Sequence, residues 1–457
     1  AIEEEDRWVP LHLREKLSVL HILGIAASNL APSVLWMITP TFFEPLSSKL
    51  KVSKIWQTII LFGGSLSGFV VCPLAGVYSD SCTFKYGRRR MFLIIIGLLM
   101  MCYCCEIGEF LNPDNPNPVQ QFVFGFSYEF VCTAGNILQT PCRSLCSDVT
   151  PLHQQNLMAN ICSFFGGLGG IVVNIVGGLR LYEHTSLSQD QFMLVVSAIC
   201  CTIPILISVI VTPEERLTTK PPCINPFKDT FDAIKTLPKP VSRTLLSMLF
   251  AQIAYFQFAF QFNHFMGKDI FKGDNSDPTK KDMVKRYDDG VAWSMFCGAM
   301  RYGGQSVFGI FNAQLIDKFG YKWNTFIGYL CLTIGEVFFF FVNNKYAYLF
   351  IPILHGIGCG VALTVPYAIA SICATIYKQN IGAFFGILIM VTVIGEQCSN
   401  LGVGSGLAQI WGDNPRLNIA VSCVFGVIAT GFSFLVIEPP YSKEQLTTLT
   451  TTSTDNS

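Results

Sequence analysis

Long apolar stretches alternate with short polar gaps along the whole chain of 457 residues. A helix needs about 20 mostly apolar residues to cross a membrane, and twelve stretches approach or exceed that length. They cover 17–40, 56–77, 91–109, 119–141, 157–180, 192–212, 242–266, 290–314, 324–342, 347–374, 381–406 and 417–437. The pattern therefore predicts an all-α integral membrane protein with twelve transmembrane helices.

The widest polar gap, 213–241, divides these spans into six and six. We expect an N-terminal six-helix bundle over 1–212, a cytoplasmic linker loop over 213–241 and a C-terminal six-helix bundle over 242–440. The polar tail 441–457 is expected to be disordered. A second polar insert, 267–289, follows the seventh span. Repeated bundles of this kind are expected to rock against each other around a site near the middle of the membrane.

Composition agrees with the spans, because 51% of the residues are hydrophobic and only 14% are charged, with a mean hydropathy of +0.45. The formal net charge is zero, which gives no reason to expect a nucleic-acid partner. Most of the 18 cysteines lie in apolar runs and are expected to be reduced and structural. No metal-ligand spacing and no nucleotide-binding motif is present, so we expect no cofactor and no nucleotide. The acidic start, AIEEEDRWVP, does not read as a signal peptide.

The loops predict an orientation, because cytoplasmic loops of membrane proteins carry an excess of Lys and Arg. With the N-terminus inside, the inner segments hold 18 of these residues and the outer segments hold 12. Six of those 12 belong to the insert 267–289, which also carries Asp residues. Both termini are therefore expected to be cytoplasmic. The membrane itself is expected to be the plasma membrane or a vacuolar or lysosomal membrane.

A dense basic cluster, GVYSDSCTFKYGRRR (76–90), fills the gap between the second and third spans. The excess of Lys and Arg in cytoplasmic loops explains the positive charge of this cluster. It does not explain Asp80 at the helix end or Gly87. A shorter echo, LIDKFGYK (315–322), stands at the matching place in the second half. We interpret the two stretches as a cytoplasmic gate that can hold neighbouring helices together. Its expected residues are Asp80, Gly87, Arg88, Arg89, Asp317 and Gly320.

Five stretches in their order resemble the sucrose transporter family, a branch of the major facilitator superfamily. Particularly similar is the long interval between the acid and the glycine in SDSCTFKYGRRR. The others are ITPTFFEPL (38–46), NILQTPCRSLCSDVT (136–150), FNHFMGKDIFKGD (262–274) and GVALTVPYAIAS (360–371). The resemblance implies the major facilitator fold, with two six-helix bundles. It also implies transport of a sugar, such as sucrose, maltose or a related glucoside or hexose, with a proton.

The resemblance points to Arg143 as a residue near the substrate. In the family this arginine pairs with an aspartate eleven residues earlier on the same helix, where this chain has Cys132. Glu129 lies one helical turn before Cys132, so the acid that carries the proton is expected to have moved there. Glu396, in the eleventh span, is the next candidate for proton coupling, ahead of Glu336 in the ninth. A bland interpretation of Glu129 is that it only caps the outer end of its span.

Polar and aromatic side chains inside the spans are the other candidates for sugar binding. Amides can bind sugar hydroxyls, but they also join helices to one another. Histidines can titrate near neutral pH, although packing is the more common role for residues such as His355. The expected substrate-binding residues, besides Arg143, are Gln139, Asn136, Asn160, Trp36, Tyr255, Arg301 and His264.

The leading hypothesis is a proton-coupled sugar symporter, whose partners are a small sugar, the proton and the lipid bilayer. An uncoupled facilitator or exporter is the alternative that Cys132 favours. A transporter-like sugar receptor is a further alternative, but the short linker loop and tail argue against it. An enzyme is not expected, because no nucleophile with an adjacent base and no His-rich metal box is present. The sequence leaves the particular sugar open.

Overall fold

The computed structural model describes residues 9–37, 50–96 apart from 86 and 91, 117–187, 189–217, 226–274, 279–400 and 414–440. Within those ranges nearly all residues lie in helices, and none lies in a strand. The expected disordered tail 441–457 lies outside the described residues. The stretch ITPTFFEPL (38–46) also lies outside them. Of the third expected span, 91–109, only residues 92–96 are described.

The main helices follow the expected spans closely. Their bounds are α1 Val19–Ala26, α3 Lys54–Asp80, α5 Pro118–Val149, α6 Gln155–Gly178, α7 Gln189–Val211, α8 Pro226–Lys235, α9 Lys239–His264, α10 Lys281–Val337, α11 Ile351–Ile376, α12 Ile381–Gln397 and α14 Pro415–Phe432. Short 3₁₀ turns are Leu11–Leu13, Ala27–Asn29, Leu152–Gln154, Leu181–His184, Phe338–Phe340, Ala347–Leu349 and Ser433–Leu435, and a π-helical turn covers Phe265–Ile270.

Side-chain caps and prolines explain where several helices begin. Ser53 accepts a hydrogen bond from the backbone N–H of Trp56 at the start of α3. Asn117 accepts one from Gln120 at the start of α5, where Pro118 takes the first helical position. Such caps satisfy backbone N–H groups that have no partner inside the helix. The sequence therefore sets these helix starts locally.

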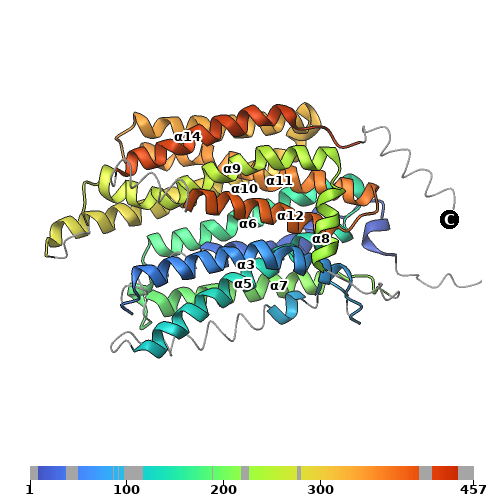
Figure 1. Ribbon diagram of the computed structural model, residues 1–457, viewed down its shortest axis with the longest axis horizontal. Coiled ribbons are helices and arrows are strands. Elements are labelled where there is room, and N and C mark those ends of the chain that lie inside the picture. Colours follow the sequence, from blue (N-terminus) through green and yellow to red (C-terminus); the bar gives the residue numbers. More distant parts are fainter. Residues whose placement is uncertain are drawn as a thin grey trace, which may run out of the picture.

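The long helices run side by side along one direction and form two groups (Figure 1). In this view α9, α11, α12 and α14 lie in the upper part, and α3, α5 and α7 lie in the lower part. α6 of the first half packs along α10 of the second half, and α3 packs on α12. α8 crosses the helix direction at one end of the molecule. The two halves of the chain thus meet chiefly along these two helix pairs, with further contacts of α6 with α11 and of α12 with α5.

The helix α10 is two helices that meet at Gly320, whose φ of 79° and ψ of 169° are non-helical. They correspond to the eighth and ninth expected spans. Across the described ranges, nine helical segments are long and apolar enough to cross a membrane, with α10 counted once. α5 is a further long helix between two of them.

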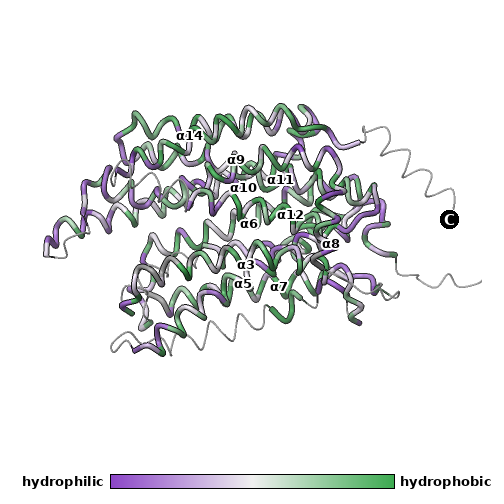
Figure 2. Tube along the Cα trace, viewed as in Figure 1, coloured by the Kyte–Doolittle hydropathy of each residue, from purple (hydrophilic) through white to green (hydrophobic). Residues whose placement is uncertain are grey.

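Hydropathy follows the same direction as the helices. Apolar residues dominate the middle of the helices, and polar residues gather at both ends of the molecule (Figure 2). Large apolar side chains point outward from several helices, for example Phe122, Ile210 and Phe350, at 73%, 76% and 65% exposure. An outward apolar band is what contact with lipid tails requires. The described residues therefore have the surface of a multi-pass membrane protein.

Glycines allow the two halves to approach closely, as expected for the string 166–178. A Cβ on Gly170 would run into the ring of Tyr302 on α10, and one on Gly178 would lie 3.2 Å from Phe296 Cζ. On the other helix pair, a Cβ on Gly382 of α12 would lie 2.7 Å from the carbonyl oxygen of Gly76 on α3. Small residues bring helix backbones together in this way when no hydrophobic force from water assists.

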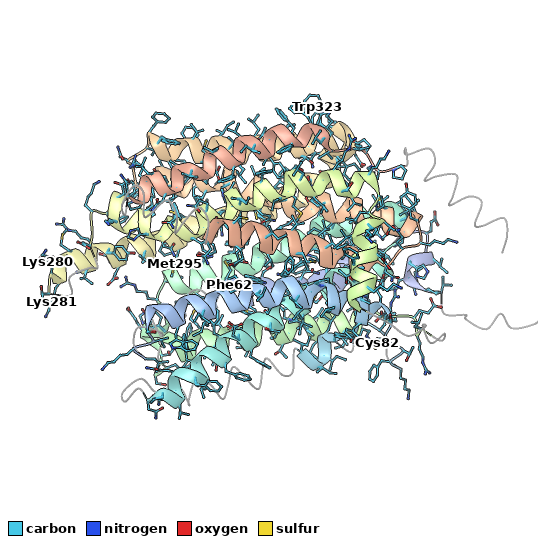
Figure 3. The ribbon with its side chains drawn as sticks, viewed as in Figure 1. Phe62, Cys82, Lys280, Lys281, Met295 and Trp323 are labelled. Carbon is cyan, nitrogen blue, oxygen red and sulfur yellow. The ribbon has the colours of Figure 1, made fainter. Side chains whose placement is uncertain are left out.

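The polar gaps contain more helix than expected. The linker 213–241, expected as a loop, contains the ten-residue helix α8, which packs against α3 and α12. In the insert 267–289, α10 begins at Lys281, before the apolar run starts. Figure 3 shows Lys280 and Lys281 at one tip of the molecule and Cys82, in the basic loop, toward the other. These ends are called the Lys280 end and the Arg89 end below.

The described cysteines are free thiols, and most of them are buried or half-buried among apolar side chains. Cys72, Cys142 and Cys359, for instance, are at most 5% exposed. A thiol in such a place packs as a small apolar group. That the cysteines are reduced and structural stays a prediction.

Candidate functional site

The basic loop at the Arg89 end folds around one buried guanidinium. Arg89 is 0% exposed, and it contacts the carboxylate of Asp80 and the hydroxyl of Ser79 at the end of α3. Its Nε also donates to Asp148 Oδ2 on α5, at 3.0 Å. A buried cation is tolerated only when it is paired and hydrogen-bonded. Arg89 therefore fixes the loop 81–90 to two helices at once.

Arg88 and Glu214 complete this cluster. Arg88 Nη2 lies 2.9 Å from Asp148 Oδ2, and its Nε lies 3.5 Å from Glu214 Oε1. The backbone N–H of Arg89 donates to Glu214 Oε2 at 2.9 Å. The latch, as we call it, consists of Asp80, Arg88, Arg89, Asp148 and Glu214.

The charges of the latch shift the proton affinities of its members. Burial alone would lower the pKa of the Arg89 guanidinium, but the carboxylates of Asp80, Asp148 and Glu214 outweigh it and hold that pKa above its usual value. Burial raises the pKa of the Glu214 carboxyl above its usual range, and Arg89 offsets only part of this effect. Arg89 therefore stays charged, whereas Glu214 gives up its charge more readily than a glutamate in water.

Gly87 has a role in the latch that no other residue type fills without strain. Its φ is 113°, in the region that L-residues rarely adopt. A Cβ at this position would lie 2.8 Å from Glu214 Cβ. The glycine thus lets the loop turn and lets Glu214 reach the backbone N–H groups of Arg89 and Arg90.

The latch also touches the second half of the molecule. A Cβ on Gly382 of α12 would lie 2.7 Å from Asp80 Oδ2 and 3.0 Å from Arg89 Nη1. Nearby, Ser147 of α5 is hydrogen-bonded to Ser371 of α11, and Ser371 also donates to Gln155 Oε1. The two bundles are therefore in direct polar contact at the Arg89 end.

The second copy of the motif repeats the turn but not the buried pair. Gly320 has a φ of 79°, and a Cβ there would lie 2.7 Å from Glu438 Oε1. The backbone N–H of Lys322 donates to the same oxygen at 3.3 Å. Asp317, in contrast to Asp80, is exposed. In both halves, the backbone of the basic loop thus donates hydrogen bonds to a glutamate that follows the last span of that half.

Sequence reasoning missed Asp148, Glu214 and Glu438, although each contacts the residues it singled out. A signal for two of them is present in the chain. Glu214 follows the sixth span in VTPEER, and Glu438 follows the twelfth in VIEPP. One acid with a neighbouring proline therefore stands at the end of each half.

Arg143 reaches from α5 across the interface between the bundles. Its Nη1 donates to the carbonyl oxygen of Leu363 on α11 at 3.1 Å, and its guanidinium lies 3.9 Å from the centre of the Tyr367 ring. Together with Ser147, Gln155 and Ser371 it borders a cavity of about 20 Å³. The site thus combines a planar cation, an aromatic face, an amide and hydroxyls.

Arg301 and Tyr255 lie together in the second bundle. Arg301 on α10 is 6% exposed, and its guanidinium lies 4.9 Å from the Tyr255 ring and 4.3 Å from the Tyr302 ring. The hydroxyl groups of Tyr255 and Tyr302 are 3.1 Å apart. Tyr302 also donates to Met37 Sδ of the first bundle at 2.8 Å. The two tyrosines therefore stand between Arg301 and the bundle interface.

The expected amides fall into different environments. Asn160 on α6 accepts a hydrogen bond from Asn312 Nδ2 on α10 at 2.7 Å. Asn312 also donates to Thr364 on α11. These hydrogen bonds join the two bundles. Asn136 instead donates to the Gly64 carbonyl oxygen and to Ser67 on α3, which is packing within one bundle.

The remaining expected binding residues are dispersed. Gln139 on α5 and Trp36, in the first span, are half-buried. His264 Nδ1 lies 3.1 Å from the Tyr287 hydroxyl, near the Lys280 end. The structure thus brings Arg143 and Asn160 to the interface and leaves His264 at the far end. A substrate-binding role for each of these residues stays a prediction.

The candidate proton carriers are separate from Arg143. Glu129 on α5 seats its carboxyl group beside Gly63 of α3, where an added Cβ would lie 3.0 Å from Glu129 Cδ. Cys132 packs one turn further along, with its Sγ 3.1 Å from the place of a Cβ on Gly64. Glu396 is 6% exposed on α12. Both acids are therefore shielded from water to different degrees, and their coupling role stays a prediction.

The sequence of this chain is similar to known transporters. The Major Facilitator Superfamily profile matches residues 24–273, and the profile of sugar (and other) transporters matches 249–444. A sucrose transport protein of Arabidopsis thaliana is 23% identical, over 91% of this chain and 89% of that protein. A general alpha-glucoside permease of Schizosaccharomyces pombe is 24% identical, over 55% of this chain and 48% of that protein. These matches confirm the resemblance to sucrose transporters.

Two solved structures share the fold. The proton:xylose symporter XylE bound to 6-bromo-6-deoxy-D-glucose matches with a TM-score of 0.63 and 15% identity, over 95% of this chain and 100% of that one. FucP in the outward conformation matches with a TM-score of 0.61 and 12% identity, over 92% and 99%. The described helices therefore have the twelve-helix arrangement of this superfamily. The chain belongs to the Major Facilitator Superfamily, and it is a multi-pass membrane transporter rather than an enzyme.

Proposed function

We propose that this protein moves a sugar across a membrane, together with a proton, by alternating access. The observation that carries the proposal is the position of Arg143 between the bundles. Its guanidinium and the Tyr367 ring offer a planar donor and an aromatic face, and Gln155 and Ser371 add an amide and a hydroxyl. Sugars present hydroxyl groups and apolar ring faces, which these groups complement.

Two further features support a sugar as the substrate. The second half of the chain matches the profile of sugar transporters. The relatives are described as transporters of sucrose and as a permease for alpha-glucosides. We therefore propose sucrose, maltose or a related glucoside or hexose as the substrate class.

The closed Arg89 end supports alternating access. The cavity at Arg143 has a volume of about 20 Å³, which holds no sugar, so the bundles must separate before one binds. The contact between Gly76 and Gly382 and the hydrogen bond between Ser147 and Ser371 hold that end together. In the proposed cycle this end opens when the opposite end shuts, as rigid bundles rock about the site.

Proton coupling is the finer part of the proposal, with Glu129 as the first carrier and Glu396 as the next. A carboxyl group within a membrane protein can cross between states when its proton neutralises it. A second candidate function is an uncoupled facilitator or exporter. The observation that favours it is Cys132, a half-buried thiol at the place where the family has an aspartate.

Localisation is also a proposal. We place the protein in the plasma membrane or in a vacuolar or lysosomal membrane, with both termini in the cytoplasm. The larger number of Lys and Arg on the Arg89 side supports this orientation.

Uptake into proteoliposomes tests the function directly. Purified protein is reconstituted, and radiolabelled sucrose, maltose and glucose are offered with and without an inward proton gradient. We expect accumulation of at least one sugar that requires the gradient. Equilibration without accumulation would identify a facilitator, and no uptake of any sugar would refute sugar transport.

The variant Arg143→Lys tests the site itself. Lysine keeps the charge but loses the planar fork and the flat contact with Tyr367. We expect its sugar affinity to fall by about tenfold, which corresponds to the loss of one good hydrogen bond. An unchanged affinity would mean that Arg143 only joins the bundles.

A further inference from the structure

A second pair of ionisable groups is buried in the C-terminal bundle, outside the cavity at Arg143. Glu336 lies on the second part of α10, and His355 lies on α11. They are 0% and 1% exposed, and His355 Nε2 is 3.6 Å from Glu336 Oε1. An acid and a base so close together in the interior need a reason, because burying either one as a lone charge is costly.

The pair has few other polar contacts. Neither ring nitrogen of His355 has a hydrogen-bond partner within the described ranges, and the polar group that meets the Glu336 carboxyl besides His355 is the Ser422 hydroxyl of α14. The carboxyl group lies over Gly426 of α14, where an added Cβ would be 2.8 Å from Glu336 Oε2. The Phe258 ring covers His355 at 4.1 Å. The two groups therefore depend chiefly on each other.

His355 connects this pair to Arg301. The Tyr255 ring stacks on the His355 ring, with the two ring centres 5.6 Å apart. The Arg301 guanidinium lies 4.9 Å from the centre of the same Tyr255 ring. Arg301 Nε and Nη1 also have no hydrogen-bond partner among the residues that the structure describes. Arg301 is permanently charged, so it is sensitive to any charge that appears at His355 or Glu336.

Other titratable groups around the pair come from four elements. They are Tyr255 on α9, Arg301, Tyr302 and Tyr329 on α10, Cys359 on α11 and Cys423 on α14. None of them carries a carboxyl group, so Glu336 is the acid that can balance Arg301 in this region of the described structure when it loses its proton. The next acid toward the Lys280 end, Asp269, is paired with Arg416 beyond Phe265 and Phe339.

We propose that Glu336 and His355 form a proton-binding site that holds one proton and thereby sets the charge balance of Arg301. Arg301 opposes a positive charge on His355, so the bound proton resides on Glu336 and the pair is neutral. When the proton leaves, Glu336 is negative and attracts Arg301. With the proton bound, Arg301 is released from that attraction.

The consequence reaches the bundle interface through the two tyrosines. Tyr255 and Tyr302 lie against Arg301, and Tyr302 contacts Met37 of the other bundle. A released Arg301 can donate Nε and Nη1 toward a hydroxyl group of the substrate. This link to the sugar rests on the proposed function, whereas the proton site itself does not.

Infrared spectroscopy of the purified protein tests the proton site without any sugar. We expect a carboxylic-acid C=O band that changes with pH and that is absent in Glu336→Gln. In His355→Gln the midpoint should move by about one pH unit or more. Circular dichroism shows whether each variant is folded, and if Glu336→Gln does not fold, His355→Gln decides. A spectrum whose pH dependence is the same in every folded variant overturns the proposal.

Sugar binding at two pH values tests the link to transport. Calorimetry with sucrose, maltose and glucose should show that the wild-type affinity changes with pH by up to about tenfold per unit, and that Glu336→Gln has lost this dependence. If Glu336→Gln keeps the wild-type dependence, the link is wrong although sugar binding stands. If the wild type binds none of the sugars, the proposed function fails. The infrared titration then remains the test of whether Glu336 and His355 bind a proton.

Discussion

Arg89 shows how a single side chain can order a loop at the edge of a membrane. A guanidinium has five N–H donors in a fixed plane, and Arg89 uses them on groups of α3 and α5. Each of its acidic partners would be costly to bury alone, so the cluster is stable only as a unit. The loop conformation that permits this unit depends on Gly87, whose backbone no other residue adopts without strain.

Replacing Gly87 with alanine should destabilise the protein. The positive φ costs about 1–3 kcal/mol for an L-residue, and the new Cβ would press on Glu214. We expect Gly87→Ala to lower the unfolding temperature in detergent by a few degrees. Gly431→Ala is the matched control, because a Cβ there meets nothing within 4 Å. Equal effects in the two variants would mean that the turn carries no particular strain.

At the scale of elements, helix pairing follows from small residues in register. α3 presents Gly76 to Gly382 of α12, and Pro73 to Gly386 of the same helix. α6 presents its glycine string to Tyr302, Met295 and Phe296 of α10 (Figure 3 labels Met295). These contacts join one bundle to the other, so they are the surfaces that must slide or part during transport.

Hydropathy predicted these helices well because lipid requires every spanning segment to be long, apolar and helical. It failed in the polar segments, where α8 and the start of α10 owe their order to packing and to local propensity. It also failed to identify the partners of the latch. Glu214 lies 125 residues from Arg89 in the sequence, and a contact of that kind depends on the tertiary fold.

The amides show the same limit at the candidate site. Asn136 and Asn160 both sit in apolar helices, and their sequence context is alike. Asn136 packs within a bundle, whereas Asn160 joins the two bundles through Asn312. Only the relative rotation of the helices separates these two outcomes, and no local pattern encodes it.

Placing a methyl group on Gly382 should force the Arg89 end open. The new Cβ would lie 2.7 Å from both the Gly76 carbonyl oxygen and Asp80 Oδ2, and overpacking of this kind costs about 1–3 kcal/mol. We expect Gly382→Ala to speed hydrogen exchange at the start of α12 and the end of α3. Gly303→Ala, where a Cβ meets nothing within 4 Å, should exchange like the wild type. Unchanged exchange in Gly382→Ala would show that the helices adjust without parting.

At the scale of the whole molecule, the contacts between the bundles stabilise one state of the proposed cycle. Transport requires that no state be too stable, because each must give way to the next. The latch belongs mostly to the first bundle and only touches α12, so it can persist when the bundles separate. We therefore expect it to shape the surface on which the second bundle closes.

Neutralising Asp80 tests this role. Asp80→Asn removes one charge partner of Arg89 but leaves Asp148 and Glu214 in place. We expect turnover to fall by about tenfold, as a shift of roughly 1.4 kcal/mol between states would produce, while surface abundance and sugar binding persist. Asp317→Asn is the matched control, because Asp317 is exposed. Wild-type turnover in Asp80→Asn would rule out the latch as a gating element.

Coupling between sugar and proton is the finer part of the proposed function, and Glu129 is its first candidate carrier. The carboxyl group seats beside Gly63 rather than beside Arg143, so any link between them passes through α5. Glu129→Gln should abolish accumulation driven by a pH gradient, because the neutral amide carries no proton. Exchange of sugar for sugar needs no net proton movement and should continue.

The comparison with Glu336→Gln shows where coupling resides. If Glu129→Gln still accumulates sugar like the wild type and Glu336→Gln does not, the coupling proton belongs to the C-terminal bundle. If both variants accumulate sugar, Glu396 is the next acid to change. If the wild type equilibrates sugar but never accumulates it, the protein is a facilitator. Cys132 then accounts for the lost coupling, because it stands where the family has its aspartate, so the carboxyl group that would exchange a proton is missing there.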